Sequence, residues 1–390
     1  MTVNPANPPR PALRAADKKS FAYFNATHKW REIIEKGISN IRDLINSSDI
    51  DINEEGKKII ASMEKLINQI QRNDHLIQIE DDGRPDIITW NDALNTYFKD
   101  EDWFTTSWLF AECYIYRRIV SIITNTKHWR NYDPFFRQKE ESFKLSFSGI
   151  IEFSKRIDEL ISSKVKIDDS ITFYELAKIS LLGNATDLSM LPNFGADGNI
   201  QTKQSEELEK NILANDLEKA WKWLSKYSNA RVDFILDNAG FELYSDLIFS
   251  DWLIQSGYVS EVHLHIKLIP WYVSDTTLND FHWLLKTLKS DDFFSSASEI
   301  EKSSLEKLVN RDLNYRKLVY DCKWETVTPF KEAIGPLANS KNAFPLLSLR
   351  TGKSDIFVGL DEGVEERLGP DKSWMYSGKY AVIQFSEGNK

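Results

Sequence analysis

The sequence predicts an α/β fold, a three-layer α/β/α Rossmann-like sandwich with an N-terminal helical bundle domain. Residues 231–260 read as a strand, a polar turn and a helix, and a second strand follows at residues 262–268. Before about residue 230, apolar residues recur at helical spacing without an alternating run of strand length, which predicts the bundle. We expect residues 1–19 to be disordered, residues 20–200 to form the helical domain and residues 201–390 to form the α/β/α metal-binding catalytic domain.

The turn after the first predicted strand is the candidate active site. The strand, residues 232–236, runs into Asp237-Asn238-Ala239-Gly240, which supplies two short polar side chains and a glycine. A helical pattern begins directly afterwards. Ligands bind at the carboxyl end of the strand in such a unit, beside the positive end of the next helix. An acid beside an amide suits a hard divalent cation, which prefers oxygen ligands.

The second predicted strand alternates apolar residues with His263, His265 and Lys267. Two histidines at positions i and i+2 could bind a metal ion. Because no third ligand lies within sequence reach, we expect a solvated strand face instead.

Asp275 follows this second strand, just before a helix predicted for residues 278–288. Taken alone, Asp275 reads as a helix N-cap. Carboxylates at the ends of successive parallel strands converge on one crevice, however. Together with Asp237 and Asn238, Asp275 would then complete a set of three oxygen ligands, which leaves coordination positions open for water and substrate.

The predicted bundle contains charged residues inside an apolar helical run, residues 108–119. Glu112, Arg117 and Arg118 must therefore be paired or lie along one exposed edge. In one interpretation, Glu112 pairs with Tyr116 or an arginine inside the bundle. In the other, Glu112 and an arginine point into the crevice and bind substrate hydroxyls or a phosphate.

The C-terminal part begins with a helix predicted for about residues 205–227. Later, Arg350 to Lys353 (RTGK) offers a backbone donor, a hydroxyl and two cations in one turn, an inventory that suits a phosphate. A solvated basic turn is the plainer interpretation. Strand-type apolar runs are predicted at residues 356–358 and 381–383.

Composition narrows the class of partner. The formal net charge of -10 argues against nucleic acid or an anionic membrane surface as the main partner. Two cysteines argue against a disulfide framework or a thiolate zinc site, and no apolar run reaches membrane-spanning length. We expect a small-molecule partner and a cytoplasmic location, with a nuclear location also open; the oligomeric state is not predicted.

Several stretches of the sequence, taken in order, resemble the damage-control phosphatase family, in particular its subfamily III with an RTxK motif. The likeness extends from about residue 20 over most of the chain. In that family an apolar strand and a Lys-Gly pair precede the DLNYR motif, whereas residues 305–311 of this chain read LEKLVNR. The matching stretches are AECYIYRR (111–118), DNAGFEL (237–243), WYVSDTT (271–277), DLNYRKL (312–318) and RTGK (350–353).

The resemblance implies a helical domain on an α/β/α sandwich and a role in metabolite damage control. It implies a phosphatase that depends on Mn²⁺, Co²⁺, Ni²⁺ or Mg²⁺ and hydrolyses sugar phosphates such as fructose 1-phosphate. Asp237, Asn238 and Asp275 would bind the metal and, with Lys353, carry catalysis. Asp237 would either attack phosphorus itself or only hold the cation while water attacks. The implied substrate contacts are Asp312, Leu313, Asn314, Tyr315, Arg316 and Lys353, to which we add Arg350 and Glu112 as candidates.

The same subfamily has also been described as a carboxyl methyltransferase that uses S-adenosylmethionine on acidic protein side chains, so this activity is the alternative prediction. Glu242 and Asp275 would then contact the cofactor. A nucleotide cofactor normally needs a glycine-rich first turn, whereas the DNAG turn has one glycine. We therefore rank methyl transfer below hydrolysis.

Overall fold

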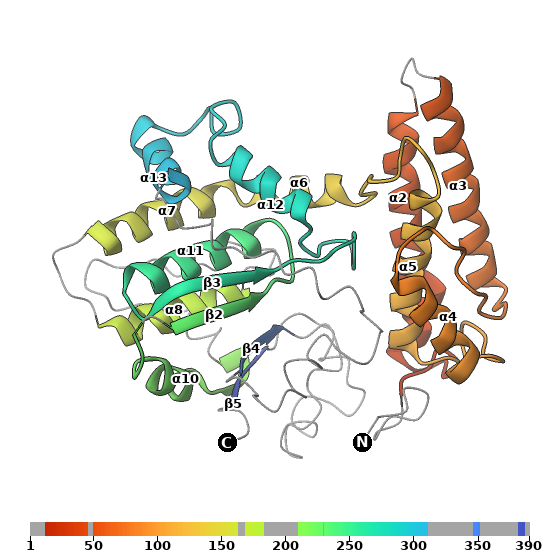
Figure 1. Ribbon diagram of the computed structural model, residues 1–390, viewed down its shortest axis with the longest axis horizontal. Coiled ribbons are helices and arrows are strands. Elements are labelled where there is room, and N and C mark those ends of the chain that lie inside the picture. Colours follow the sequence, from red (N-terminus) through yellow and green to blue (C-terminus); the bar gives the residue numbers. More distant parts are fainter. Residues whose placement is uncertain are drawn as a thin grey trace. The chain divides into compact units, whose positions relative to one another are not determined.

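The chain divides into two compact units that each combine distant segments. Unit 1 comprises Met1–Lys139, Lys267–Asp275 and Cys322–Pro336, and unit 2 comprises Glu140–Ile266, Thr276–Asp321 and Leu337–Lys390. The segment with the candidate ligand Asp275 thus belongs with the N-terminal helices, and the domain boundaries expected from the sequence stay a prediction. The computed structural model (Figure 1) describes residues 12–45, 50–162, 168–182, 210–228, 230–310, 346–351 and 381–386.

Unit 1 is helical in its described part, as the sequence predicts. α2 packs on α3, and α3 packs on α5. Residues at every third or fourth position form the buried stripe of α2, for example Trp30, Ile34, Ile38 and Ile41. The elements are α1 (Phe21–Phe24), the π-helical turn η1 (Asn25–Lys29), α2 (Trp30–Leu44), α3 (Ile50–Gln71), α4 (Asp86–Tyr97), α5 (Trp108–Thr124) and the first part of α6 (Phe136–Leu145).

Residues 12–20, within and just after the segment for which we expected disorder, make specific contacts. The Leu13 carbonyl accepts a hydrogen bond of 2.8 Å from the Trp108 backbone N–H. Ser20 caps α1, because its side chain accepts from the Tyr23 backbone N–H. Residues 1–11 lie outside the described residues.

A buried ionic cluster joins α5 to Asp82 and to Asp86 at the start of α4. The Arg117 guanidinium donates to Asp82 Oδ2 and to Asp86 Oδ2, each at 2.7 Å. The side chains of Arg117 and Asp82 are both fully buried. The structure therefore contradicts the interpretation in which Glu112 neutralises this arginine, because two aspartates from a different segment already do so.

Unit 2 contains the predicted strand–turn–helix–strand unit, which is confirmed. β2 (Ala230–Ile235) and β3 (Val259–His265) pair in parallel, and α11 (Phe241–Gln255) connects them. α12 (Leu278–Thr287) follows β3, close to the predicted helix.

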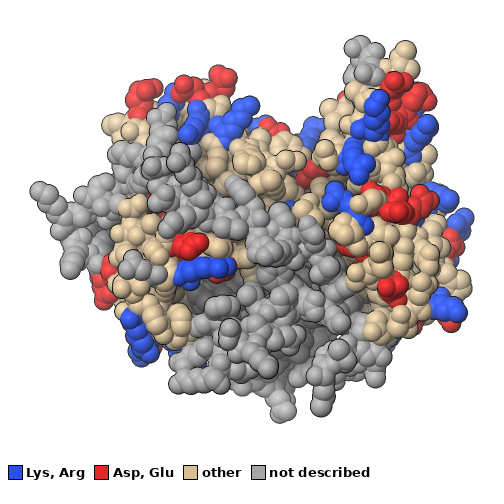
Figure 2. Space-filling view, in the orientation of Figure 1, with Lys and Arg blue, Asp and Glu red and all other residues tan. Residues whose placement is uncertain are grey.

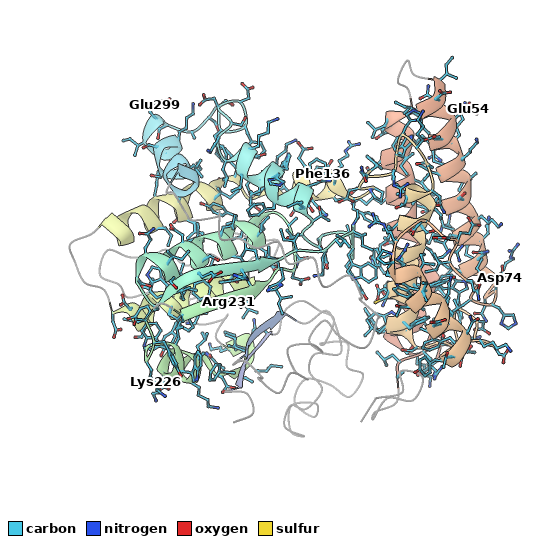
Figure 3. All side chains as sticks on the ribbon, viewed as in Figure 1. Glu54, Asp74, Phe136, Lys226, Arg231 and Glu299 are labelled. Carbon is cyan, nitrogen blue, oxygen red and sulfur yellow. The ribbon has the colours of Figure 1, made fainter. Side chains whose placement is uncertain are left out.

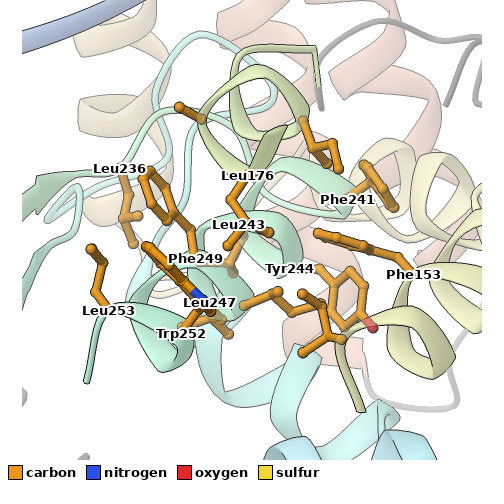
Figure 4. Close-up of a cluster of buried hydrophobic side chains, with 14 of the residues drawn as sticks. Phe153, Leu176, Leu236, Phe241, Leu243, Tyr244, Leu247, Phe249, Trp252 and Leu253 are labelled. Carbon is orange, nitrogen blue, oxygen red and sulfur yellow. The ribbon is translucent and has the colours of Figure 1, made fainter. Parts of the chain in front are cut away.

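Helices from the middle of the chain pack on α11 and build the main core of unit 2. α8 (Asp169–Leu182) and α7 (Phe147–Ser162) both contact α11, and α7 also contacts α13 (Glu299–Asn310). From Phe241 to Leu253 every residue of α11 except Glu242 is buried. Figure 4 shows Phe153 of α7 and Leu176 of α8 among the buried side chains of α11. This packing fixes α11, and with it the turn at its start.

The predicted helix at residues 205–227 is wrong at residues 212–215, and residues 205–209 lie outside the described residues. β1 (Ile212–Asn215) pairs in parallel with β5 (Ala381–Ser386), and only α10 (Leu217–Leu224) is helical after it. Pairing with the distant β5 overrides the local helical preference. β4 (Leu346–Thr351) is antiparallel to β5, and this sheet has the order β1-β5-β4.

The expected solvated face of the second strand is also wrong, because His263 and His265 are buried. Their charged partners come from the same two strands. His265 Nε2 lies 2.8 Å from Asp233 Oδ1, and His263 Nε2 lies 2.6 Å from Glu261 Oε1. Burial alone would raise the pKa of Asp233, but hydrogen bonds from His265 and from Arg231 (Figure 3) outweigh it and lower the pKa to about 2. The polar face is satisfied by internal pairing rather than by solvent.

The described residues therefore show a mixed fold of helices and small sheets, one of them purely parallel. The three-layer arrangement stays a prediction. Charges of both signs are interspersed over the described surface seen in Figure 2. Among the described residues, no helix has both the length and the apolar character needed to cross a membrane.

Replacing Arg117 with Met tests the buried cluster. The substitution leaves the Asp82 carboxylate buried without its cation, so we expect the free energy of unfolding to fall by about 3–5 kcal/mol. Urea denaturation measures the change. Arg31→Met is the matched control, since Arg31 forms an exposed pair with Glu35 on α2 and its loss is expected to cost less than about 0.5 kcal/mol. Equal losses in the two variants would contradict the assigned role of the cluster.

Candidate metal and substrate site

The turn that carries Asp237 and Asn238 depends on Gly240. Gly240 adopts φ 82° and ψ -132° as the residue before α11, a conformation that is essentially restricted to glycine. Its carbonyl accepts from the Tyr244 backbone N–H at 3.0 Å, which starts the helix. On the strand side, the Leu236 N–H donates to the His265 carbonyl at 3.1 Å. Asp237 and Asn238 therefore stand between the end of a parallel ladder and a helix N-terminus, as the sequence predicts.

Contacts within the turn fix the Asn238 side chain. Its Nδ2 donates to Asp237 Oδ2 at 3.1 Å and to Glu242 Oε2 at 2.8 Å. Asn238 is buried, whereas Asp237 is exposed. The Asp237 carbonyl accepts a hydrogen bond of 2.6 Å from the backbone N–H of Thr276, the residue directly after Asp275 in the chain.

The carboxyl groups around this turn repel one another. The pKa of Glu242 is raised well above its ordinary value, first by burial and then by the charges of Asp237 and Asp246. The pKa of Asp246 rises to about 7, again mainly through burial, with Asp237 adding to the shift and a hydrogen bond from Ser180 opposing it. A cation bound at Asp237 would favour the ionised forms and lower both pKa values. The electrostatics of the turn therefore suit a positively charged ligand.

Asp275 is buried in unit 1 and lies between two lysines. Lys267 Nζ is 3.0 Å from Asp275 Oδ2. The buried Lys139 Nζ donates to the Asp275 carbonyl at 2.9 Å and to Asp133 Oδ2 at 2.8 Å. The interpretation of Asp275 as a helix cap is wrong, because Thr277 caps α12 in a capping box with Asp280. The Asp275 carboxylate is therefore not used to cap the helix.

The backbone before Asp275 adopts a rare conformation. Tyr272 and Val273 have φ 44° and φ 67°, and a positive φ is a genuine outlier for a β-branched residue. The ring of Tyr272 stacks on Tyr116 of α5 at a centroid distance of 4.8 Å, and its hydroxyl lies 3.2 Å from Cys113 Sγ. Such strain persists only where the surroundings over-determine it, and it concentrates at functional sites.

Glu112 and Asp275 act on the same tyrosine inside unit 1. The pKa of Tyr116 is raised well above its ordinary value, first by burial and then by the charges of Glu112 and Asp275. Burial raises the pKa of Glu112 itself to about 8. The Trp30 indole N–H counteracts part of this shift, although its Nε1 forms no hydrogen bond of ordinary geometry. Glu112 therefore carries a proton at neutral pH, and no ionised arginine partner is needed to explain its burial.

The candidate phosphate-binding residues fall largely outside the described part of the chain. Arg350 lies in β4, and its backbone alone is described. α13 ends at Asn310, so the residues directly before the DLNYR motif are helical where the resemblance implies a strand. Asp312, Leu313, Asn314, Tyr315, Arg316 and Lys353 lie outside the described residues.

Sequence reasoning missed both lysines that contact Asp275. Lys267 stands on the polar side of the alternating pattern, which was interpreted as a solvated face. Lys139 lies in a polar helical run, where nothing in the local sequence marks it as buried. Its partners are Asp133 and the carbonyl of Asp275, which is 136 positions later in the chain. Among the described residues, no group of three or more His, Cys, Asp or Glu side chains could hold a metal ion.

Comparison with known proteins identifies the family. The family model described as damage-control phosphatase ARMT1-like domain matches residues 26–312. The chain belongs to this family. It is 34% identical to the damage-control phosphatase ARMT1 of Xenopus tropicalis, over 96% of the chain and 98% of that protein. It is 33% identical to the damage-control phosphatase ARMT1 of Homo sapiens, over 99% of each.

Within the family match, the turn at Asp237 and the segment around Asp275 are both included, and the match ends at Asp312. The alignment with the Xenopus tropicalis protein spans 441 positions, more than the 390 residues of this chain. That relative therefore carries residues that this chain lacks. Among solved structures, a DUF89 family protein from Pyrococcus horikoshii matches with a TM-score of 0.32 and 15% identity, over 67% of this chain and 68% of that chain.

Replacing Glu112 with Gln tests its buried proton. A carboxyl group with a raised folded-state pKa keeps its proton where the unfolded chain has released it. The free energy of unfolding therefore falls as the pH rises from about 4.5 to about 8. We expect Glu112→Gln to remove on the order of 2–4 kcal/mol of this fall.

Urea denaturation at pH 5 and pH 8 measures the difference between Glu112→Gln and the parent chain. Glu35→Gln, an exposed substitution on α2, is the control and should keep the pH dependence of the parent chain. Parallel curves for Glu112→Gln and the parent chain would show that Glu112 is ionised in the folded protein.

Proposed function

We propose that this protein is a divalent-metal-dependent phosphatase that hydrolyses phosphomonoesters of sugars, with fructose 1-phosphate as a representative substrate. The observation that carries the proposal is the Asp237–Asn238 turn at the carboxyl end of β2, inside the region matched by the damage-control phosphatase family. Membership of that family supports phosphatase chemistry in metabolite repair. The metal dependence and the sugar phosphate are our own extension of it.

The donor groups at the turn fit a hard divalent cation. Asp237 contributes a carboxylate, and Asn238 contributes an amide oxygen directed away from its own Nδ2 contacts. Oxygen ligands of this kind suit Mg²⁺ or Mn²⁺, and the family resemblance also admits Co²⁺ and Ni²⁺. We propose Asp275 as the third ligand. Its carboxylate is buried and lies 3.0 Å from Lys267 Nζ.

When bound, the cation would neutralise phosphate oxygens as negative charge moves to the leaving group. The protein side chains then divide the remaining work. Asn238 and Asp275 would hold the cation together with Asp237, and Lys353, with Arg316 and Arg350, would add positive charge on the transferring phosphoryl group. Glu112, protonated at neutral pH, can donate a hydrogen bond to a sugar hydroxyl.

Two roles stay open for Asp237. As a nucleophile, its carboxylate would attack phosphorus as the P–O bond to the sugar breaks and the sugar leaves as its alcohol, and water would then hydrolyse the aspartyl phosphate to release inorganic phosphate. As a ligand alone, it would hold the cation while water attacks phosphorus directly. Acid quenching of the enzyme during turnover of ³²P-labelled substrate separates the two, since only the first route leaves label on the protein.

Replacing Asp237 with Ala tests the proposal. Loss of one preorganised contact to the reacting group typically lowers kcat by roughly 10²–10³. We expect at least that loss in release of inorganic phosphate from fructose 1-phosphate with Mn²⁺ or Co²⁺, together with weaker metal binding. Glu218→Ala, which removes an exposed acid of α10, is the control and should keep normal turnover. Near-normal turnover by Asp237→Ala would refute the site.

The alternative activity, carboxyl methyl transfer, is tested by the same preparations. In this alternative, Glu242 and Asp275 would contact S-adenosylmethionine. Glu242 already accepts a hydrogen bond from the Asn238 amide, so its carboxyl group is engaged within the turn. Tight binding of S-adenosylmethionine without metal, combined with no phosphate release from any sugar phosphate, would reverse the ranking.

A further inference from the structure

We infer that Glu242 is a positioning residue for metal binding, which it serves by holding the Asn238 side-chain amide in the orientation that presents Oδ1 to the cation. The inference rests on the proposed function, because it takes Asn238 as a metal ligand. It gives Glu242 a role different from contact with S-adenosylmethionine. It is carried by the geometry of the turn.

The contacts of Asn238 identify which end of its amide is the nitrogen. Nδ2 lies 2.8 Å from Glu242 Oε2 and 3.1 Å from Asp237 Oδ2. Both acids accept from this atom, and of the two amide atoms only the nitrogen donates hydrogen bonds. Rotating the amide by 180° would bring Oδ1 against the two oxygens that accept from Nδ2. The acids therefore select one orientation, and Oδ1 lies on the opposite side from them.

Asp237 alone would select the orientation weakly. Asp237 is exposed, and its side chain is free to turn toward solvent or a ligand. Glu242 differs, because it lies in the first turn of α11, whose neighbouring residues are all buried. Its backbone carbonyl is also held, since Ser245 Oγ donates to it at 2.8 Å. The contact from Glu242 is therefore the shorter of the two and the one fixed by the fold.

In this arrangement Glu242 orients Asn238, the proposed metal ligand. Groups that hydrogen-bond to a metal ligand fix its orientation, and their removal typically costs about 10–100-fold in metal affinity. Asn238 and Glu242 lie four residues apart, on either side of the Gly240 turn. The spacing across a glycine-dependent turn is what allows a helix residue to reach back to the residue that follows the strand.

The test compares two substitutions of Glu242 that both remove its charge. Glu242→Gln keeps a side-chain oxygen that can accept from Asn238 Nδ2, whereas Glu242→Leu keeps the bulk and removes the acceptor. Titration calorimetry of the full chain with Mn²⁺ gives the dissociation constant. We expect the dissociation constant to stay within about threefold of the parent value for Gln and to rise by about 10–100-fold for Leu. Equal weakening in both variants would show that charge alone matters and would overturn the inference.

A double-mutant cycle separates positioning from a general loss of structure. If Glu242 acts through Asn238, Glu242→Leu should add little to the weakening already caused by Asn238→Ala. Additive losses would contradict the inference. Thermal unfolding of each variant without metal checks the fold, and Glu242→Ala replaces Glu242→Leu in the cycle if the leucine is not tolerated.

The outcomes also distinguish this inference from the proposed function. If the parent chain binds Mn²⁺, Asp237→Ala loses that binding and both Glu242 variants bind like the parent chain, only the positioning role fails. If the parent chain binds no divalent metal, both fail together. A change in S-adenosylmethionine binding with unchanged Mn²⁺ binding would assign Glu242 to the alternative activity.

Discussion

The backbone conformation of Gly240 is the constraint on which the candidate site depends. With φ 82° and ψ -132°, it turns the chain from the end of β2 into α11 within five residues. A residue with a Cβ would resist that conformation. The buried faces of α11 hold the far side of the turn, and the parallel pairing with β3 holds the near side. Asp237 and Asn238 are thus presented by a local geometry that rigid elements fix from both ends.

That geometry concentrates negative charge at a cost to the protein. Glu242 and Asp246 follow Asp237 on successive turns of α11, and burial with mutual repulsion raises the pKa of each. A fold selected for stability alone would place a lysine or an apolar residue at one of these positions. A bound cation offsets the repulsion directly. The unfavourable arrangement therefore supports the proposal that a cation binds at this turn.

The sequence was sufficient to predict an element where its local pattern and its tertiary packing favour the same structure. The β2–α11–β3 unit follows from an apolar run, a glycine turn and helical spacing, and α2, α3 and α5 follow from their apolar stripes. Prediction from the sequence failed where a residue or strand that is distant in the chain determines the local structure. β1 is a strand because β5 pairs with it, and His265 is buried because Asp233 lies across the sheet. Neither partner is visible in the local sequence. The roles of Asp237, Asn238 and Asp275 in catalysis stay predictions.

Asp275 illustrates why a candidate site residue can be found from the sequence while the residues that contact it cannot. Its position after β3 and before α12 follows from the pattern of elements. Its environment depends on Lys267, eight residues earlier, and on Lys139, which comes from α6. A buried carboxylate without a cation would be costly; Lys267 pairs with the Asp275 carboxylate, and Lys139 holds its backbone carbonyl. The strained backbone at Tyr272 and Val273 adds a further cost. The strained turn and the buried Lys139 beside it support the proposal that the Asp275 carboxylate has a functional task.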